Sequence, residues 1–259
     1  MTPEERKLYQ LHAYRYLPKR VEEARRIIKQ GFERMKNPMI SMSFGKDSVV
    51  MTHLILNVNP ATPVVYERCK DFNEWTDTQR VKDEFLTRFP CEYHEIEGPS
   101  LIDTFREAGF YIQDEAESDR AGQAQKRYSR LKKETLNQFA RGNGHDGSFI
   151  GMRLDESVKR KALFLKQGPL YFAKARGLWA CNPLAYWKAA DTWAYIVTNN
   201  LPYDELYDKN PIGRENARNG AMCGTRGATF FGRMTQLKQM YPSIFNEFAA
   251  EFPEVRHYI

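Results

Sequence analysis

The stretch SFGKDS, residues 43–48, brings together the groups from which proteins build anion-binding loops. It follows the apolar run 39–42 and precedes apolar residues within 49–55, so we expect it between a strand and a helix. The first amides of a helix lack partners within the helix, and the helix dipole is positive there, so a phosphate binds readily. Gly45 allows close backbone approach to a ligand, and Lys46 adds a positive charge. The stretch therefore predicts a phosphate-binding turn, with an ordinary polar helix start as the alternative.

The other side chains of this stretch refine the prediction. Ser43 and Ser48 can donate hydroxyl hydrogen bonds to the same anion. Asp47 can either cap the following helix or hold a magnesium ion through water. Phe44 strongly disfavours a positive φ, so we expect any such conformation at Gly45 and expect the Phe44 ring to pack beside a bound base. The stretch is not a Walker A loop, because its glycine and hydroxyl residues are spaced differently.

A second group of cations follows an expected strand at 148–152. Arg153 would lie at the carboxyl end of that strand, where its forked donors suit phosphate or sulfate. We therefore predict a ligand-binding role for Arg153. Lys159 and Lys161 come later, in an expected helix, and are more simply explained as a solvated face.

Strand and helix patterns alternate along the chain, which predicts an α/β fold with a mostly parallel twisted sheet and helices on both faces. The expected strands are 39–43, 63–66, 92–96, 148–152 and 179–184, and the expected helices are 47–57, 74–88, 100–108, 117–140, 155–166 and 189–199. In such sheets ligands bind beyond the carboxyl ends of the strands, which is where both cationic segments fall.

Helical additions flank this central unit. Residues 3–36 have apolar side chains at helical spacing, and Pro18 predicts two helices rather than one. Residues 202–226 are expected to be irregular and 228–250 to be helical. The predicted organisation is a helical segment at 1–37, a central ligand-binding domain at 38–200 and an extension at 201–259.

The bulk composition limits the class of protein. The chain has 259 residues, 42% of them apolar, which is enough for a substantial core. No apolar stretch approaches the roughly 20 residues of a membrane span, and the first residues do not resemble a signal peptide. We therefore expect a cytoplasmic protein with no membrane partner. The net charge of +6 suits anionic partners without choosing among them.

The chain has four dispersed cysteines and no C-x-x-C pair: Cys69, Cys91, Cys181 and Cys223. That spacing disfavours a zinc ribbon or a dithiol redox motif and is typical of reduced thiols in the cytosol. An iron–sulfur cluster, which can use dispersed cysteines, stays open as a weaker alternative. Cys223 lies close to glycines and arginines in the sequence, so it is a candidate reactive thiol, with a structural thiol as the simpler alternative.

The loop and several later segments together resemble one known family. SFGKDS resembles the S-G-G-x-D-S loop of the PP-loop ATP pyrophosphatases, with Phe44 in place of the first glycine. GMRLDES at 151–157 is similar to the G-x-R-x-x-E-S element of the phosphoadenosine-phosphosulfate reductase-like branch of that superfamily. Three further segments extend the similarity over most of residues 38–226: NPLAYW at 182–187, DTW at 191–193 and LPYDELY at 201–207. The branch includes the ATP pyrophosphatases of DNA phosphorothioation systems.

The resemblance implies an adenine nucleotide alpha hydrolase-like fold, a PP-loop nucleotide-binding domain, and binding of ATP with Mg²⁺. The residues that it implies in nucleotide binding are Ser43, Phe44, Gly45, Lys46, Asp47, Ser48, Tyr66, Gly151, Arg153 and Arg160. Lys46, Asp47 and Arg153 are expected to act in catalysis, and Asp47 to hold the magnesium ion. Tyr66 is included because the backbone of the first two strands commonly reads adenine in this superfamily.

The function that we expect from this resemblance is adenylation of a substrate for sulfur transfer by an ATP pyrophosphatase, in DNA phosphorothioation. The alternative is a phosphoadenosine-phosphosulfate reductase or a sulfate adenylyltransferase subunit. Reductases of the branch end in an E-C-G-[IL]-H-type tail, whereas this sequence has no cysteine after Cys223. A second alternative is a non-catalytic adaptor that binds a nucleotide or DNA.

Expected partners follow from charge and from the resemblance. The basic segment 120–133 and later arginines, among them Arg214, favour DNA binding, with a solvated helix face as the alternative because acidic residues interleave. The resemblance also implies a cysteine desulfurase or another sulfur-pathway protein as a partner, with Cys223 as the sulfur acceptor. We further expect a homo-oligomer.

Overall fold

A six-stranded sheet in the order β3-β2-β1-β4-β6-β5 forms the centre of the molecule. The computed structural model describes residues 1–71, 76–107, 118–209, 213–215, 235 and 237–259. The strands are β1 (Pro38–Met42), β2 (Val64–Arg68), β3 (Tyr93–Glu97), β4 (Gly147–Ile150), β5 (Leu170–Ala173) and β6 (Leu178–Cys181). All neighbours pair in parallel except β5, which is antiparallel to β6. The chain leaves β1 toward β2 on one side and later returns to β4 on the other, so β1 lies at the switch point of the sheet.

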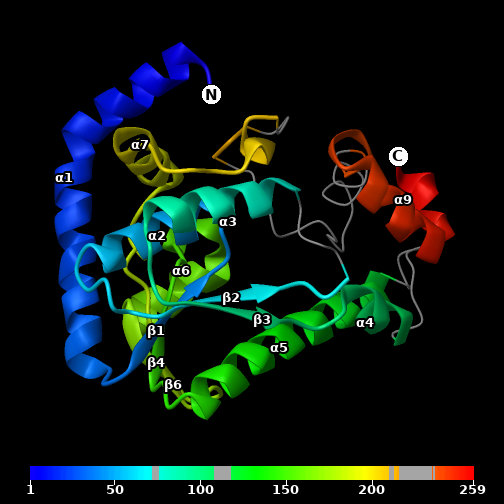
Figure 1. Ribbon diagram of the computed structural model, residues 1–259, viewed down its shortest axis with the longest axis horizontal. Helices are drawn as coiled ribbons and strands as arrows, with labels where there is room; N and C mark the ends of the chain where they lie inside the picture. The colour runs from blue at the N-terminus through cyan, green and yellow to red at the C-terminus, as the bar shows by residue number, and fades with distance from the viewer. Residues whose placement is uncertain (72–75, 108–117, 210–212, 216–234, 236) are drawn as a thin grey trace.

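Helices cover both faces of this sheet, which confirms the predicted α/β fold (Figure 1). The helices are α1 (Pro3–Arg34), α2 (Lys46–Leu56), α3 (Thr76–Arg88), α4 (Leu101–Glu107), α5 (Ser118–Gly142), α6 (Val158–Gln167), α7 (Ala189–Asn199) and α9 (Pro242–Glu251). Short 3-10 helices accompany them: η1 (Leu154–Glu156), η2 (Glu205–Tyr207) and η3 (Pro253–Tyr258). Within the described ranges, every helix is too short or too polar to cross a bilayer.

The alternation of side chains along the strands creates a core on each face of the sheet. Ile40 and Met42 of β1 face the larger core, which also contains buried residues of α1, α2, α3 and α7. Met39, which precedes Ile40, faces the opposite side and packs with Val65 of β2 and Ala140 of α5. Because both faces of β1 are buried, only its carboxyl end is available to position functional groups.

The N-terminal segment is one helix of 32 residues, so the predicted break at Pro18 is wrong. Pro18 lies on the exposed side of α1. Leu17 and Ile27, on either side of Pro18 in the sequence, are buried in the larger core. Proline removes one helical hydrogen bond, but burial of apolar side chains on both sides of it outweighs that cost. The helix start is also capped, since Thr2 Oγ1 accepts the Glu5 amide at 3.2 Å.

One further element differs from the sequence prediction. β5 is absent from the prediction, because its four residues, LYFA, show no clear alternation and it pairs only with β6 at the edge of the sheet. The expected helical stretch at 228–250 is confirmed in its described part, because residues 235 and 237–240 are helical and α9 continues from Pro242 after a break at Tyr241. Proline favours the first position of a helix and interrupts a longer one. The domain boundaries at 37 and 200 stay a prediction.

Helix α1 approaches the sheet most closely at Gly31. A Cβ atom at this position would lie 2.7 Å from Phe149 Cε1 and 2.9 Å from Cys181 Sγ, both fully buried. We expect Gly31→Ala to destabilise the protein by about 2 kcal/mol, although alanine is the better helix former. Gly142→Ala is the matched control, since nothing lies within 4 Å of its Cβ position. Urea unfolding of both variants measures this, and equal stabilities would contradict the close approach.

Candidate functional site

The SFGKDS loop joins the carboxyl end of β1 to the start of α2, in the middle of the sheet. Gly45 is the N-cap residue of α2, and its carbonyl accepts the Val49 amide at 3.0 Å. Asp47 therefore does not cap the helix, and that alternative is wrong. The amides of Asp47 and Ser48 belong to the first turn, whose N–H groups point out of the helix end. This end of α2 has the dipole and the donors of an anion-binding turn.

The two serine hydroxyls stabilise the loop from within. Ser48 Oγ donates to the Gly45 carbonyl at 3.0 Å and accepts the Ser43 amide at 3.2 Å. Ser43 Oγ lies 3.0 Å from Ser48 Oγ. Because the single hydroxyl hydrogen of Ser48 is used by Gly45, Ser43 is the donor in that pair. Ser48 thus maintains the shape of the turn. Its hydroxyl could donate to a ligand only if its hydrogen bond to the Gly45 carbonyl broke.

Phe44, and not Gly45, adopts the positive φ of the loop. Its φ is 52°, whereas Gly45 has a φ of −73°, so that prediction is wrong. The Phe44 ring is fully buried and packs edge-on against Tyr66 at 5.0 Å, with Phe85 at 6.5 Å. A left-handed conformation costs about 1–2 kcal/mol, and burial of a phenylalanine ring recovers more than that. Phe44 and Tyr66 therefore anchor the loop in the core, and neither ring is exposed for stacking on a base.

Two buried cations converge on Asp47 beside the loop. Lys46 and Arg153 are only 4% and 3% exposed. Lys46 Nζ lies 3.4 Å from Asp47 Oδ2, and Arg153 Nε lies 2.8 Å from Asp47 Oδ1 in an ion pair without hydrogen-bond geometry. Arg153 Nη1 also donates to both carboxylate oxygens of Asp155, at 2.9 and 3.0 Å. Asp47 reduces the repulsion between the two cations and so allows both to be buried.

The segment after β4 brings Arg153 to the loop. A Cβ atom on Gly151 would lie 3.2 Å from the Ser48 amide nitrogen, so only glycine allows this close approach without displacement. Two residues later, the Arg153 amide donates to Glu156 Oε2 at 2.8 Å. Arg160, a predicted ligand contact, pairs with that same Glu156. The ion pair between Arg160 and Glu156 therefore stabilises the segment that contains Arg153.

Helix α7 supplies a contact that sequence reasoning missed. Thr192 is fully buried, and its hydroxyl donates to Asp47 Oδ1 at 2.9 Å. The preceding residue, Asp191, lies 2.7 Å from His12 Nε2 and 3.3 Å from Arg20 Nε, both on α1. The DTW segment is part of the family resemblance, but nothing in the sequence pairs Thr192 with Asp47, which is 145 positions away.

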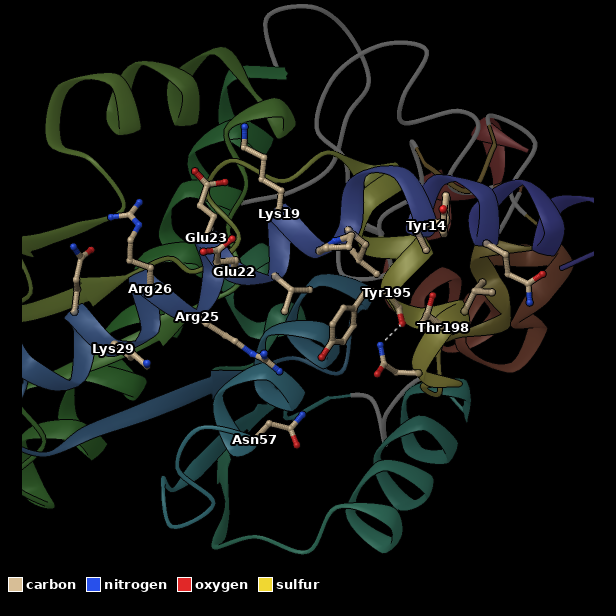
Figure 2. Close-up of a pocket in the computed structure, with 18 of the residues that line it drawn as sticks. Tyr14, Lys19, Glu22, Glu23, Arg25, Arg26, Lys29, Asn57, Tyr195 and Thr198 are labelled. Atoms are coloured by element: carbon tan, nitrogen blue, oxygen red, sulfur yellow. Dashed lines mark hydrogen bonds between the residues drawn. The ribbon is translucent and has the colours of Figure 1, made fainter.

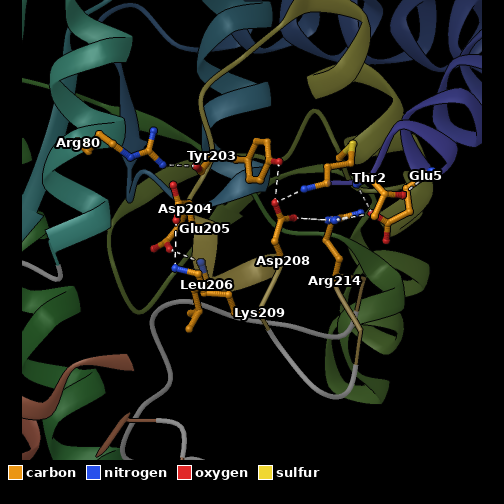
Figure 3. Close-up of polar contacts among 11 residues, drawn as sticks. Thr2, Glu5, Arg80, Tyr203, Asp204, Glu205, Leu206, Asp208, Lys209 and Arg214 are labelled. Carbon is orange, nitrogen blue, oxygen red and sulfur yellow. Dashed lines mark hydrogen bonds and ion pairs between the residues drawn. The ribbon is translucent and has the colours of Figure 1, made fainter. Parts of the chain in front are cut away.

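A strap formed by residues 201–208 contacts the site through Tyr207, and Figure 3 shows the polar contacts that hold this strap. Tyr207 is 2% exposed, its hydroxyl accepts the Lys46 amide at 3.4 Å, and its ring centroid is 5.0 Å from Lys46 Nζ. Asp208 accepts hydrogen bonds from Tyr203, the N-terminal ammonium group and Arg214, which also contacts Glu5. Burial alone would raise the pKa of Asp208, but these hydrogen bonds outweigh it and lower the pKa.

Some cations of the surface predicted to bind DNA contact acidic side chains, whereas Arg218, Arg226 and Arg233 lie outside the described residues. Within the described part of the segment 120–133, the exposed cations are Lys126, Arg127, Arg130 and Lys133. Arg127 pairs with Glu107, and Lys132 is directed to the buried Glu67, at 3.9 Å. Arg214 is only 8% exposed, because it is taken up by the contacts of the strap. The exposed cations of this segment remain as a surface for a polyanion.

Titratable groups also gather at the carboxyl end of β2, on the side of the sheet covered by α5. Burial raises the pKa of Glu67 to about 7, against a smaller opposite effect of Lys132. Cys69 is half-buried, and its sulfur accepts the Tyr128 hydroxyl at 3.4 Å. Burial raises the pKa of the Cys181 thiol, which lies in the larger core and is unreactive there. Cys223 lies outside the described residues, and within the described part no three His, Cys, Asp or Glu side chains are grouped as metal ligands.

A hollow of about 1450 Å³ lies between α1 and the C-terminal ends of α2 and α7 (Figure 2). Its walls include Tyr14 and Arg25 of α1 and Tyr195 of α7, and no residue of the SFGKDS loop lines it. Acidic and basic side chains interleave along its α1 wall, and no group of described metal ligands lies there. The buried cations of the loop, rather than this larger hollow, therefore define the candidate site.

The fold and the loop together define an α/β nucleotide-binding class, and comparison with known proteins narrows it. The family model for the phosphoadenosine phosphosulfate reductase domain matches residues 37–246. The chain therefore belongs to the phosphoadenosine phosphosulfate reductase domain family, within the adenine nucleotide alpha hydrolase-like superfamily.

Individual relatives are distant. The chain is similar to a phosphoadenosine 5'-phosphosulfate reductase of Gloeobacter violaceus, with 29% identity over 66% of each chain. It is also similar to an uncharacterized protein of Methanocaldococcus jannaschii, with 24% identity over 85% of this chain and 42% of the relative. These alignments thus span less than two thirds of the relatives' own length.

Solved structures agree on the fold. The phosphoadenylyl-sulfate reductase of Candida auris aligns with a TM-score of 0.52 and 15% identity, over 81% of this chain and 92% of that one. A U34-tRNA thiolase of Methanococcus maripaludis, solved with its [4Fe-4S] cluster, aligns with the same score and identity over 92% and 78%. At this identity the likeness establishes the fold alone.

Because Phe44 is fully buried and has a positive φ, we expect its substitution to lower the free energy of unfolding more than substitution of a loop residue usually does. We expect Phe44→Ala to lower the free energy of unfolding by about 3–5 kcal/mol, because the ring is lost from the core while the positive φ remains. Phe172→Ala is the control, since that ring is 44% exposed on the edge strand and its loss should cost about 1 kcal/mol. Thermal unfolding of both variants measures this, and a small effect at Phe44 would contradict its role as the anchor.

Glu67 predicts a pH dependence of stability. Its pKa rises from 4.5 to about 7 on folding, so the folded state binds its proton more tightly and this contribution to stability falls as pH rises between those values. We expect Glu67→Gln to flatten the decline in unfolding free energy between about pH 5 and about pH 8. Chemical denaturation across that range measures the slope. The exposed Glu33→Gln should leave the slope unchanged, and a slope for Glu67→Gln like that of the wild type would contradict the prediction.

Proposed function

We propose that the chain binds an adenine nucleotide with its phosphates at the start of α2, and that it is an ATP pyrophosphatase which adenylates a substrate for sulfur transfer. One observation carries the proposal: Lys46 and Arg153, both almost fully buried, converge on the first turn of α2 at the carboxyl edge of the sheet. Asp47 and Asp155 allow both cations to be buried, and the two charges then lie beside the positive end of the α2 dipole, where an anion is favoured. A nucleotide's phosphate chain is the anion that this family's fold accommodates.

The reaction divides between the two ends of the site. A substrate oxygen attacks the α-phosphorus of ATP, and the bond from that phosphorus to the bridging oxygen breaks, so pyrophosphate leaves with the electron pair. The first-turn amides of α2 and Lys46 bind the leaving pyrophosphate, while Arg153 stabilises the charge on the transferred group. Arg153 Nη2 has no acceptor within the described part of the chain and is the donor left for that role.

Magnesium commonly bridges phosphate oxygens in such reactions and neutralises their charge. The surroundings of Asp47 do not favour a metal, because its carboxylate already contacts Lys46, Arg153 and Thr192. A magnesium ion there would have to replace at least one of these contacts. Ligation by Asp47 therefore stays a prediction, and no step of the reaction is assigned to it.

A second candidate is reduction of an adenylyl sulfate, since several relatives bear reductase names. That chemistry needs a thiol, and among the described cysteines Cys69 directly follows the carboxyl end of β2, the strand next to β1. A non-catalytic adaptor is the third candidate. A role in DNA phosphorothioation has no specific support from the fold or the relatives and stays a prediction.

The deciding experiment follows products from ATP labelled at the α-phosphate. The purified protein is given sulfate, DNA or a persulfide donor in separate reactions, and pyrophosphate and adenylate are measured. Release of pyrophosphate with one acceptor supports adenylation. Sulfite from adenosine 5'-phosphosulfate or its 3'-phosphorylated form, dependent on thioredoxin, would instead establish a reductase. Tight ATP binding without turnover under all conditions would establish the adaptor.

Two substitutions test the cationic site directly. We expect Lys46→Ala and Arg153→Lys each to lower pyrophosphate release by about 100-fold, because alanine removes the charge and lysine cannot contact Asp47 and Asp155 in the fork geometry of arginine. Lys166→Ala and Arg141→Lys remove or exchange exposed cations elsewhere and should have no effect. Unchanged turnover in the site variants, with folded protein by circular dichroism, would refute the assignment of this site.

A further inference from the structure

Asp47 connects the two cations of the site, so its orientation determines where both charges lie. Its Oδ2 faces Lys46 Nζ at 3.4 Å, and its Oδ1 lies 2.8 Å from Arg153 Nε. The Arg153 contact lacks hydrogen-bond geometry and so constrains the carboxylate plane weakly. Something else must fix the rotation of the carboxylate.

Thr192 supplies that constraint. Its hydroxyl donates to Asp47 Oδ1 at 2.9 Å, which is a hydrogen bond to a charged acceptor. The residue is fully buried and β-branched, so its side chain has few alternative rotamers. This bond therefore sets Asp47 Oδ1 at one position, and Oδ2 with it.

The position of Thr192 is itself fixed by the start of α7. The preceding Asp191 accepts the Lys188 amide at 2.8 Å, which caps the helix. Asp191 also contacts His12 and Arg20 of α1, so this first turn is bound to the longest described helix of the molecule. Trp193 packs edge-on against Tyr207 at 5.2 Å, which connects the same turn to the strap. Thr192 thus projects from a rigid support toward Asp47.

We propose that Thr192 is a positioning residue for the charged end of the nucleotide: by orienting Asp47 it sets the places of Lys46 and Arg153. This inference rests on the proposed nucleotide site. Thr192 acts through Asp47 rather than by contact with the nucleotide. Removal of its hydroxyl should therefore affect recognition of the phosphates and leave recognition of the nucleoside unchanged.

The test compares ATP and adenosine binding to Thr192→Val, Thr192→Ser and wild type. We expect Thr192→Val to bind ATP about tenfold more weakly, because one hydrogen bond to a charged group no longer orients the cations. Adenosine affinity, measured by NMR titration, should not change. Thr192→Ser keeps the hydroxyl and should restore most of the ATP affinity. Calorimetry gives the ATP affinities.

Thr52→Val is the matched control for removing a buried threonine hydroxyl. Thr52 is fully buried in α2, and its hydroxyl contacts the Met42 sulfur, not a charged group. We expect its ATP affinity to equal that of wild type. Equal ATP affinity in Thr192→Val and wild type would overturn the inference while leaving the nucleotide site intact. Parallel losses for ATP and adenosine in Thr192→Val would also overturn it, and absence of ATP binding in wild type would overturn the proposed function and this inference together.

Discussion

The burial of Lys46 and Arg153 against one shared carboxylate governs the geometry of the site. Two cations in a low-dielectric interior repel each other and lose their hydration, so they are stable only with compensating charge. Asp47 and Asp155 supply that compensation through direct ion pairs. The arrangement leaves the helix dipole and the first-turn amides of α2 next to a pair of fixed positive charges. If the proposed nucleotide binds there, its phosphates meet charges that are already in place, which is the property that electrostatic catalysis requires.

The surrounding elements hold these charges in place. The loop cannot swing, because Phe44 is anchored in the core at the cost of a positive φ and Ser48 bonds within the turn. Gly151 allows the segment after β4 to pack against the same turn, and this packing brings Arg153 close to Asp47. Helix α7 and the strap enclose the opposite side through Thr192 and Tyr207. Three regions far apart in the sequence, the loop, the end of β4 and the α7–strap region, therefore meet at one helix terminus.

Family membership does not determine which reaction the chain performs, and the position of its cysteines bears on that choice. The chain belongs to the phosphoadenosine phosphosulfate reductase domain family, and membership of a fold family does not by itself determine the reaction. Cys181 is enclosed in the larger core, whereas Cys69 lies at the carboxyl edge with Tyr128 against its sulfur. The two proposed reactions therefore differ in what they require: adenylation needs the cations of the site, whereas sulfur reduction also needs a thiol at the nucleotide. Product analysis distinguishes these because they break different bonds.

Local periodicity and residue type are enough to predict the alternating α/β pattern, the turn between β1 and α2, and the cationic character of residues 46 and 153. The same local rules place the positive φ at Gly45 and a helix break at Pro18, and long-range packing overrides both. Core burial moves the positive φ to Phe44, and contacts on both sides of Pro18 keep α1 continuous. The hydrogen bond between the side chains of residues 192 and 47 spans 145 positions, and no local pattern encodes a contact that exists only after the sheet has assembled.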